Sequence, residues 1–194
     1  MITILLDSSN RELAVGLAKD NKLIAETSYE AWQRQSEAMV FELDKLLKQN
    51  NVDKKDISGI VVAIGPGSYT GVRIALTIAK VMSMALNVPL YPVSSLRVMK
   101  INSTPTIALI NARGQRSYIG VYQNEKIILE EQIMKNEEVL EYVNKHPNYT
   151  ISGDTEYLRI QSQKPHILKE MLDLMPFLHP YKEPLGLNPR YLKD

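Results

Sequence analysis

The sequence contains no cysteine, and its 23 basic and 22 acidic residues leave a formal net charge of only +1. Without thiols the chain has no disulfide bonds, no zinc–thiolate site and no cysteine nucleophile. The near-zero charge argues against a protein that binds nucleic acid mainly through electrostatic attraction. We therefore expect an intracellular protein whose contact with any nucleic acid is minor.

Long apolar runs and a secretory leader are also missing. The first residues, MITILLDSSN, carry no basic region and reach Asp7 too early for a signal peptide. No uninterrupted apolar run approaches the roughly 18 residues that span a bilayer. The sequence therefore predicts a cytoplasmic protein without a membrane partner.

Motifs for metal or nucleophilic catalysis are absent too. The three histidines, His146, His166 and His179, each adjoin a proline, and none lies four residues from another as in a helical metal site. No G-x-S-x-G elbow for a serine nucleophile is present. We predict that this chain has neither a metal site nor catalytic residues.

The most informative segment present is a glycine loop between an apolar stretch, 57–64, and a long apolar segment, 72–86. This layout predicts a strand, a tight turn and a helix, a junction that often binds ligands in α/β proteins. The spacing is one residue longer than the dinucleotide fingerprint, and the Lys-Ser/Thr of a P-loop is missing. Both a structural and a binding role remain open for the loop, which consists of Gly65, Pro66, Gly67, Ser68 and Gly71.

The segment after the loop carries only two charged residues between 72 and 86, Arg73 and Lys80. A helix that is apolar nearly all round is buried in a core or covered by a partner, and the two alternatives stay open here. Ser68 or Thr70 can cap its first turn. The residues that we expect at a partner or dimer interface are Tyr69, Thr70, Val72, Arg73, Leu76, Ala79, Lys80, Met82 and Ser83.

The chain also repeats itself. The segment from Ile4 aligns without a gap to the segment from Ala108, so that Asp7 falls on Asn111 and Gly16 on Gly120. We predict two lobes: residues 1–104, with the glycine loop and the dimerisation helix, and a smaller lobe at 105–194. The predicted strands are 2–7, 13–18, 23–28, 57–64, 88–93 and 149–152, and the predicted helices are 36–49, 72–86, one after Ser95, and 137–145.

This duplication indicates an α/β fold of two βββαβα lobes, the pattern of the actin-like ATPase (ASKHA, ribonuclease H-like) fold. That architecture implies a nucleotide cleft with a carboxylate at the end of each first strand. The first lobe has Asp7, followed by Ser8 and Ser9, but the second has Asn111. An amide is no general base and a poor Mg²⁺ ligand, so phosphoryl transfer by this chain alone is disfavoured. An ATP-dependent small-molecule kinase or ATPase remains the alternative function.

Proline punctuates the C-terminal stretch MPFLHPYKEPLGLNPRYLKD, which we expect to be extended. Its apolar side chains, among them Tyr181, Leu185 and Leu187, give it enough apolar surface to dock on the body of the protein or on a partner.

The motifs together resemble one family. The run Gly65-Pro-Gly-Ser-Tyr-Thr-Gly-Val-Arg-Ile74 is similar to the GPGSFTGxRIG signature of the bacterial TsaB (YeaZ) family. Asp7-Ser8-Ser9 resembles its opening DTS, and Pro189 to Lys193 its closing P-x-Y-L-R. The chain departs from the family pattern at Gln35, where a histidine is common, and at Asn111, where an aspartate is usual.

The resemblance implies a non-catalytic partner of TsaD, the transferase that makes N6-threonylcarbamoyladenosine (t6A) next to the tRNA anticodon. It implies a heterodimer with a TsaD homologue through the first lobe, a homodimer when alone, and the ATPase TsaE and tRNA reached through the complex. No cofactor is expected on this chain alone, although ATP or ADP is compatible with a composite site. A peptidase function, which related sequences have been assigned, is disfavoured by the missing metal motif.

Overall fold

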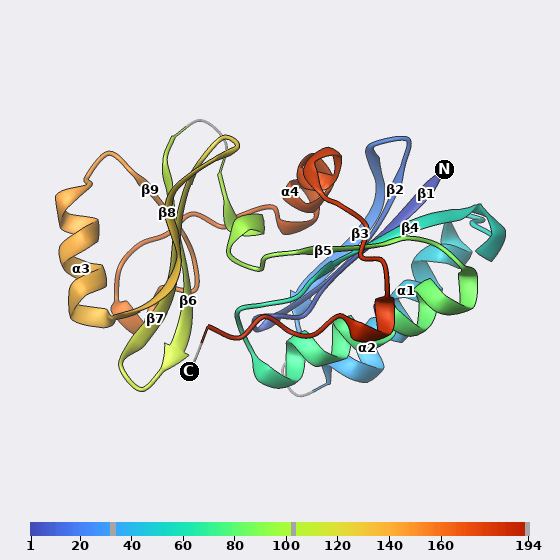
Figure 1. Ribbon diagram of the computed structural model, residues 1–194, viewed down its shortest axis with the longest axis horizontal. Helices are drawn as coiled ribbons and strands as arrows, with labels where there is room; N and C mark the ends of the chain where they lie inside the picture. The colour runs from blue at the N-terminus through green and yellow to red at the C-terminus, as the bar shows by residue number, and fades with distance from the viewer. Residues whose placement is uncertain (32–33, 102–103, 193–194) are drawn as a thin grey trace. The chain divides into compact units, whose positions relative to one another are not determined.

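A computed structural model describes residues 1–31, 34–101 and 104–192, and these form two units (Figure 1). Unit 1 comprises Met1–Ser95 together with Ile167–Arg190, and unit 2 comprises Leu96–His166 with the residues from Tyr191 onward. The predicted lobe boundary lies at residue 104 and leaves 167–190 in the second lobe. In the structure that segment instead packs with unit 1.

Unit 1 contains a five-stranded mixed sheet in the order β3-β2-β1-β4-β5. The first three strands form an antiparallel meander, and β4 and β5 run parallel to β1. The central strands β1 and β4 are buried on both faces, which explains their nearly continuous apolar sequences. The strand bounds are Ile2–Asp7 for β1, Glu12–Lys19 for β2, Lys22–Glu30 for β3, Ile57–Ala63 for β4 and Leu90–Val93 for β5.

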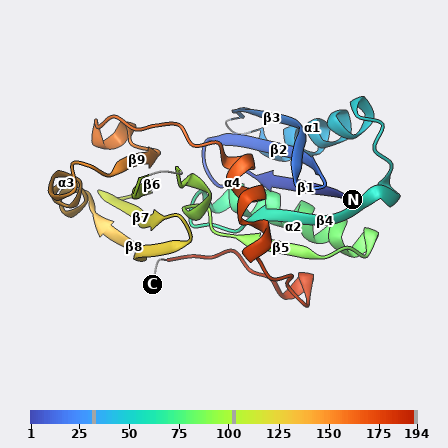
Figure 2. The same cartoon turned by 90° about the horizontal axis from the view of Figure 1, so that it is seen from above.

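Helices cover both faces of this sheet. α1 (Gln35–Gln49) and α2 (Tyr69–Leu86) lie side by side on one face, and α4 (Ile167–Leu174) lies on the other (Figures 1 and 2). The buried side of α4 faces strands β1, β2 and β3. Gly16 in β2 leaves room for it, because a Cβ there would lie 3.2 Å from a methyl carbon of Leu168.

Unit 2 repeats the first part of this pattern with a four-stranded sheet in the order β8-β7-β6-β9. The first three strands again form an antiparallel meander, and the fourth runs parallel to β6. One helix, α3, joins β8 to β9. The bounds are Thr106–Arg113 for β6, Arg116–Gln123 for β7, Lys126–Lys135 for β8, Asn136–Lys145 for α3 and Thr150–Gly153 for β9.

The helix predicted after Ser95 is wrong. In its place the chain forms a single 3₁₀ turn, Arg97–Met99. The side chains of Leu96 and Val98 are both buried, but residues two positions apart lie on different sides of a regular helix, so a helix packed on one face would expose one of them. The chain then turns through Lys100 toward β6. The other 3₁₀ turns are η1 (Lys54–Asp56), η3 (Glu156–Leu158), η4 (Met175–Phe177) and η5 (Pro184–Gly186).

Among the described residues, α2 is the one helix whose length and composition suffice to cross a membrane. This is weak evidence for a span, because the core helix of a soluble protein passes the same test. The inward side chains Ala75, Leu76 and Ala79 are buried with the sheet residues of unit 1 in one apolar core.

Candidate functional site: the glycine loop and the outer face of α1 and α2

The glycine loop is held by hydrogen bonds inside unit 1. The backbone N–H of Ser68 donates to the carbonyl of Ser9 at 2.7 Å, and that of Gly65 donates to Ser95 Oγ at 3.0 Å. The Gly65 carbonyl in turn accepts from Ser95 N at 3.0 Å. Phosphate-binding loops use free backbone N–H groups, and these two N–H groups already have acceptors. The contacts favour a structural role for this part of the loop.

Two glycines are required by close approach to the turn after β1. A Cβ at Gly71 would lie 1.9 Å from the carbonyl oxygen of Ser8, and one at Gly67 would lie 2.1 Å from that of Ser9. Ser8 Oγ also donates to the Gly71 carbonyl at 2.7 Å. Of the two predicted helix caps, the structure confirms Ser68, whose Oγ accepts from Gly71 N at 3.2 Å. The signature thus locks α2 against the end of β1.

Asp7 and Asn111 occupy aligned positions near the ends of the first strands of the two repeats. The Oδ1 of Asp7 accepts from Ser9 N at 2.7 Å, and the Oδ1 of Asn111 accepts from Arg113 N at 2.9 Å. The Asp7 side chain therefore closes the turn that follows β1. The Asn111 side chain makes the same contact, to the residue two positions on, inside β6, where the pairing with β7 is irregular. Burial raises the pKa of the Asp7 carboxyl above its ordinary value of 3.8, although hydrogen bonds from Ser9 oppose the shift.

The candidate nucleotide residues of unit 1, Asp7, Ser8 and Ser9, are all buried. They lie together at the end of β1, as their sequence positions predict. Asp7 Oδ1 and Ser8 Oγ serve the turn and the glycine loop, whereas Ser9 Oγ is buried without a hydrogen-bond partner among the described residues. Asn111 belongs to unit 2. A nucleotide cleft that includes these four residues remains a prediction.

The predicted interface residues on α2 fall on different sides of the helix. Val72, Leu76, Ala79 and Ser83 are buried within the protein, so their side chains are not available to a partner in this structure. Two others also make contacts inside unit 1: Met82 packs against the core, and Lys80 Nζ donates to the Leu185 carbonyl of η5 at 3.0 Å. The exposed members of the predicted set are Tyr69, Thr70 and Arg73.

The outward sides of α1 and α2 carry large exposed apolar side chains that are not among the predicted interface residues. Phe41 is 63% exposed and Val81 61%, which is unusual for side chains of this kind on adjacent helices. We call these side chains the α1–α2 apolar surface, and its members are Val40, Phe41, Val81 and Met84. The sequence does contain a sign of this surface, because each helix has apolar residues outside the side that faces the core as well as on it.

Comparison with known proteins identifies the family. A family model described as "TsaD: tRNA N6-adenosine threonylcarbamoyltransferase" matches residues 29–173. The "tRNA threonylcarbamoyladenosine biosynthesis protein TsaB" of Bacillus subtilis (strain 168) is 35% identical over 72% of this chain and 62% of its own length. The chain belongs to the TsaB (YeaZ) family. The match to this chain spans about three fifths of the length of the Bacillus protein.

Two further comparisons cover more of the chain. "Uncharacterized protein MG208" of Mycoplasma genitalium is 32% identical over 91% of this chain and 86% of its own length. The solved structure of "YeaZ from Pseudomonas aeruginosa" has a TM-score of 0.82 at 21% identity, over 98% of this chain and 99% of that one. The similarity in structure confirms the predicted fold class, α/β with duplicated lobes of the actin-like type.

The structure describes most, but not all, of the residues that match the TsaB motifs. Gly65 to Ile74 and Asp7 to Ser9 are described and pack together, as above. The closing motif ends on Lys193, which lies outside the described residues. Gln35, where TsaB proteins often have a histidine, begins α1, and its Nε2 donates to the Asn10 carbonyl at 3.1 Å. This contact is structural and fixes α1 to the loop after β1.

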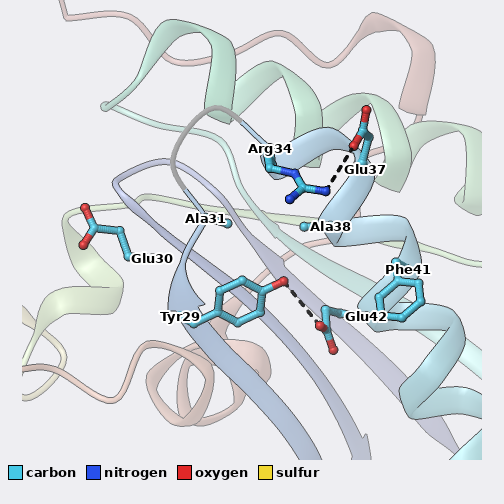
Figure 3. A pocket seen from close by; sticks show the side chains of 8 residues that line it. All are labelled: Tyr29, Glu30, Ala31, Arg34, Glu37, Ala38, Phe41 and Glu42. Atoms are coloured by element: carbon cyan, nitrogen blue, oxygen red, sulfur yellow. Dashed lines mark hydrogen bonds and ion pairs between the residues drawn. The ribbon is translucent and has the colours of Figure 1, made fainter.

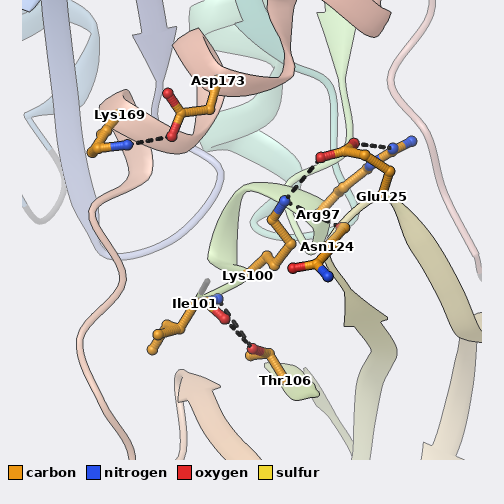
Figure 4. A network of polar contacts seen from close by, with 8 residues as sticks. All are labelled: Arg97, Lys100, Ile101, Thr106, Asn124, Glu125, Lys169 and Asp173. Carbon is orange, nitrogen blue, oxygen red and sulfur yellow. Dashed lines mark hydrogen bonds and ion pairs between the residues drawn. The ribbon is translucent and has the colours of Figure 1, made fainter. Parts of the chain in front are cut away.

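Unit 2 of this TsaB-family chain contains a polar network that includes a buried lysine (Figure 4). Lys100 Nζ donates to the Asn124 carbonyl at 3.2 Å and lies 3.5 Å from Glu125 Oε1, while Arg97 pairs with Glu125 Oε2 at 3.5 Å. The network ties the turn after Ser95 to the β7–β8 hairpin. Within residues 1–31, 34–101 and 104–192, no cluster of three or more histidine, aspartate or glutamate side chains has the arrangement to hold a metal ion.

Proposed function

We propose that this chain is a non-catalytic subunit that binds a TsaD homologue and supports t6A formation at the adenosine beside the anticodon. Family membership supports the pathway, since curated relatives carry the name tRNA threonylcarbamoyladenosine biosynthesis protein TsaB. The observation that carries the subunit role is the α1–α2 apolar surface. Exposed apolar groups of this size on two adjacent helices are typical of a protein interface.

The geometry of the first-strand turns supports the non-catalytic part of the proposal. Asp7 is buried and its carboxylate closes its own turn, and the equivalent position in the second repeat is the amide Asn111. Metal-assisted phosphoryl transfer needs carboxylates that can reach a metal and a substrate. The proposed role therefore depends on binding, with the chemistry done by the partner.

The exposed side of α1 and α2 is proposed as the shared surface for the TsaD homologue and for a second copy of this chain. Val81 and Met84 supply apolar contact from α2, Val40 and Phe41 from α1. At the N-terminal end of α2, the Arg73 guanidinium lies 4.0 Å from the centre of the Tyr69 ring, which gives the surface a polar and aromatic rim. One surface with two occupants implies that homodimer and heterodimer exclude each other.

The remaining parts of the proposal follow from that assembly. TsaE and tRNA are reached through the TsaD complex, this chain alone binds no cofactor, a site shared between subunits is compatible with ATP or ADP, and the assembly is cytoplasmic. If the chain is instead an ATPase of the actin-like fold, the purified protein hydrolyses ATP with Mg²⁺ and the substitution Asp7→Asn abolishes that activity.

The test is light scattering coupled to size exclusion on the chain alone and mixed with the TsaD homologue of the same organism. The proposal expects a heterodimer that replaces a homodimer, and it expects Val81→Glu with Met84→Glu to prevent both. Ile127→Glu with Ile128→Glu is the matched control, because it adds the same two charges at two exposed apolar residues of β8. A wild-type chain that stays monomeric in the mixture contradicts the proposal.

A further inference from the structure

A cavity of about 670 Å³ opens between the end of β3 and the start of α1, both in unit 1 (Figure 3). Its wall combines two aromatic rings with several carboxylates. The described residues that line it are Tyr29, Glu30, Ala31, Arg34, Glu37, Ala38, Phe41 and Glu42. Neither the glycine loop nor the β1 turn contributes to it, so the cavity is a separate feature of the unit.

Glu42 is the buried charged residue among the described residues that line the cavity. This residue is only 8% exposed, and its Oε1 accepts a long hydrogen bond of 3.3 Å from the Tyr29 hydroxyl. Its other oxygen lies 3.5 Å from Lys45 Nζ, on the neighbouring turn of α1. Burial, together with the negative charge and hydrogen bond of Glu42, raises the pKa of the Tyr29 hydroxyl. Because both contacts of the Glu42 carboxylate are long, its oxygens can still accept a shorter hydrogen bond from a cationic donor.

The rest of the wall is acidic at its rim and aromatic on its sides. Among the described lining residues Glu30 and Glu37 outnumber the cation Arg34, which lies 4.0 Å from Glu37 in a pair about 80% exposed on both sides. An exposed pair at that distance contributes little and is easily displaced. The aromatic rings in the wall come from two elements, Tyr29 from strand β3 and Phe41 from helix α1 (Figure 3). Carboxylates beside aromatic rings form the environment that binds guanidinium groups.

We infer that this cavity receives an arginine side chain from the protein partner that docks on the α1–α2 apolar surface. The planar guanidinium donates to the Glu42 carboxylate and stacks on the rings of Tyr29 and Phe41. Phe41 belongs both to the cavity wall and to the apolar surface, so a partner seated on that surface reaches the cavity opening. The inference rests on the proposed function for the partner's identity, whereas the cavity's preference for a guanidinium does not.

The first experiment tests that preference on the protein alone. The chain is titrated with N-acetylarginine amide, and the ring signals of Tyr29 and Phe41 are followed by NMR. N-acetylcitrulline amide is the matched probe, because it has nearly the same shape without the charge. We expect saturable shifts with the arginine probe only, and their loss in Glu42→Gln. Equal responses to both probes, or none at these rings, overturn the inference.

The second experiment measures the affinity for the TsaD homologue by calorimetry. Glu42→Gln is expected to weaken binding about tenfold, the loss of one charge-assisted contact. The control Asp44→Asn removes the same charge from the exposed side of α1 and is expected to change the affinity little. Unchanged binding in Glu42→Gln overturns the inference and leaves the proposed function standing. Failure of the wild-type chain to bind the homologue contradicts the proposed function, while the arginine titration still decides the cavity.

Discussion

At the scale of single residues, Gly71 has the least tolerance for change. Its α-carbon passes so near the turn after β1 that an added Cβ would lie 1.9 Å from the backbone oxygen of Ser8. We expect Gly71→Ala to lower the free energy of unfolding by at least about 1–3 kcal/mol, the range for overpacking, because neither backbone segment can move freely. Urea unfolding measures the change. Gly186→Ala, where the nearest atom is 4.0 Å away, serves as the control and should be nearly neutral.

At Asp7, by contrast, we expect a substitution to raise the stability of the folded state. Its pKa is raised by burial, so as pH rises above the ordinary value of 3.8 the unfolded chain loses this proton first and the folded state loses stability. Asp7→Asn removes that penalty, and Asn111 shows that an amide oxygen accepts the same kind of backbone hydrogen bond at the aligned position. We expect the variant to be more stable than wild type at neutral pH, with a flatter acid-side profile. Thermal unfolding across pH checks this, and a less stable variant contradicts it.

At the scale of elements, α2 shows what a sequence can and cannot specify. Its C-terminal end at residue 86 and Ser68 as one of two candidate caps could be predicted, because capping chemistry and apolar content are local, although the helix begins three residues earlier than predicted, at Tyr69. Its orientation could not, since a helix apolar nearly all round does not mark the side that meets the sheet. Ala79 was therefore expected at an interface but lies in the core, while Val81 and Met84 are exposed.

This orientation makes two positions on the same helix respond differently to a charge. We expect Ala79→Glu to destabilise unit 1 by at least about 3 kcal/mol, because it places an unpaired carboxylate in the core. Val81→Glu faces solvent and is expected to stay within about 0.5 kcal/mol of wild type. Circular dichroism during thermal unfolding distinguishes the two. Similar melting temperatures for both variants would mean that α2 is rotated from the orientation described.

The 3₁₀ turn η3 in unit 2 is held to β7 by Tyr157. Its hydroxyl donates to Ser117 Oγ at 2.6 Å, and Ser117 Oγ donates to Asn136 Oδ1 at 2.9 Å at the start of α3. Burial raises the pKa of Tyr157 to about 12. Between pH 10 and pH 12 the unfolded chain therefore ionises this group first, and the stability of the folded state falls.

Tyr157→Phe tests that link. The substitution removes the donor to Ser117, so we expect a loss of about 1 kcal/mol at neutral pH. The slope of stability against pH in the alkaline range should become shallower, because one group with a raised pKa is gone. Urea titrations at several alkaline pH values provide both readouts. An unchanged alkaline slope would show that Tyr157 ionises at its ordinary pKa.

At the scale of the whole molecule, the chain leaves unit 1 after Ser95 and returns to it at Ile167. The duplicated strand pattern could be predicted, because each repeat carries the same local alternation and turn. The return of the chain to unit 1 at Ile167 could not be predicted, since it depends on packing against a sheet that is distant in the sequence, and no local pattern shows this. Docking of the C-terminal stretch on the body is confirmed in particular contacts: Leu187 is buried in the core, and Tyr181 N donates to the Leu90 carbonyl at 2.8 Å.

Because 167–190 packs with unit 1, residues 1–104 do not contain all of that unit. Residues 1–104, the predicted first lobe, lack α4, whose Leu168, Met171 and Leu172 are buried. They also lack Arg190, whose N–H donates to the Ile64 carbonyl at 2.7 Å beside the glycine loop. A variant that joins 1–95 to 167–190 through a flexible glycine–serine linker restores both. We expect it to unfold cooperatively, because one apolar core is then complete.

Residues 1–104 alone are the comparison for this variant, and both are followed by urea unfolding and amide hydrogen exchange. We expect the shorter piece to exchange rapidly in β2 and β3, because α4 no longer covers these strands. The joined variant should protect the same amides. It should also still bind the TsaD homologue, because the α1–α2 apolar surface lies wholly within it. Equal protection in both pieces would mean that α4 contributes little to unit 1, and the predicted boundary at residue 104 would then describe the folding unit better.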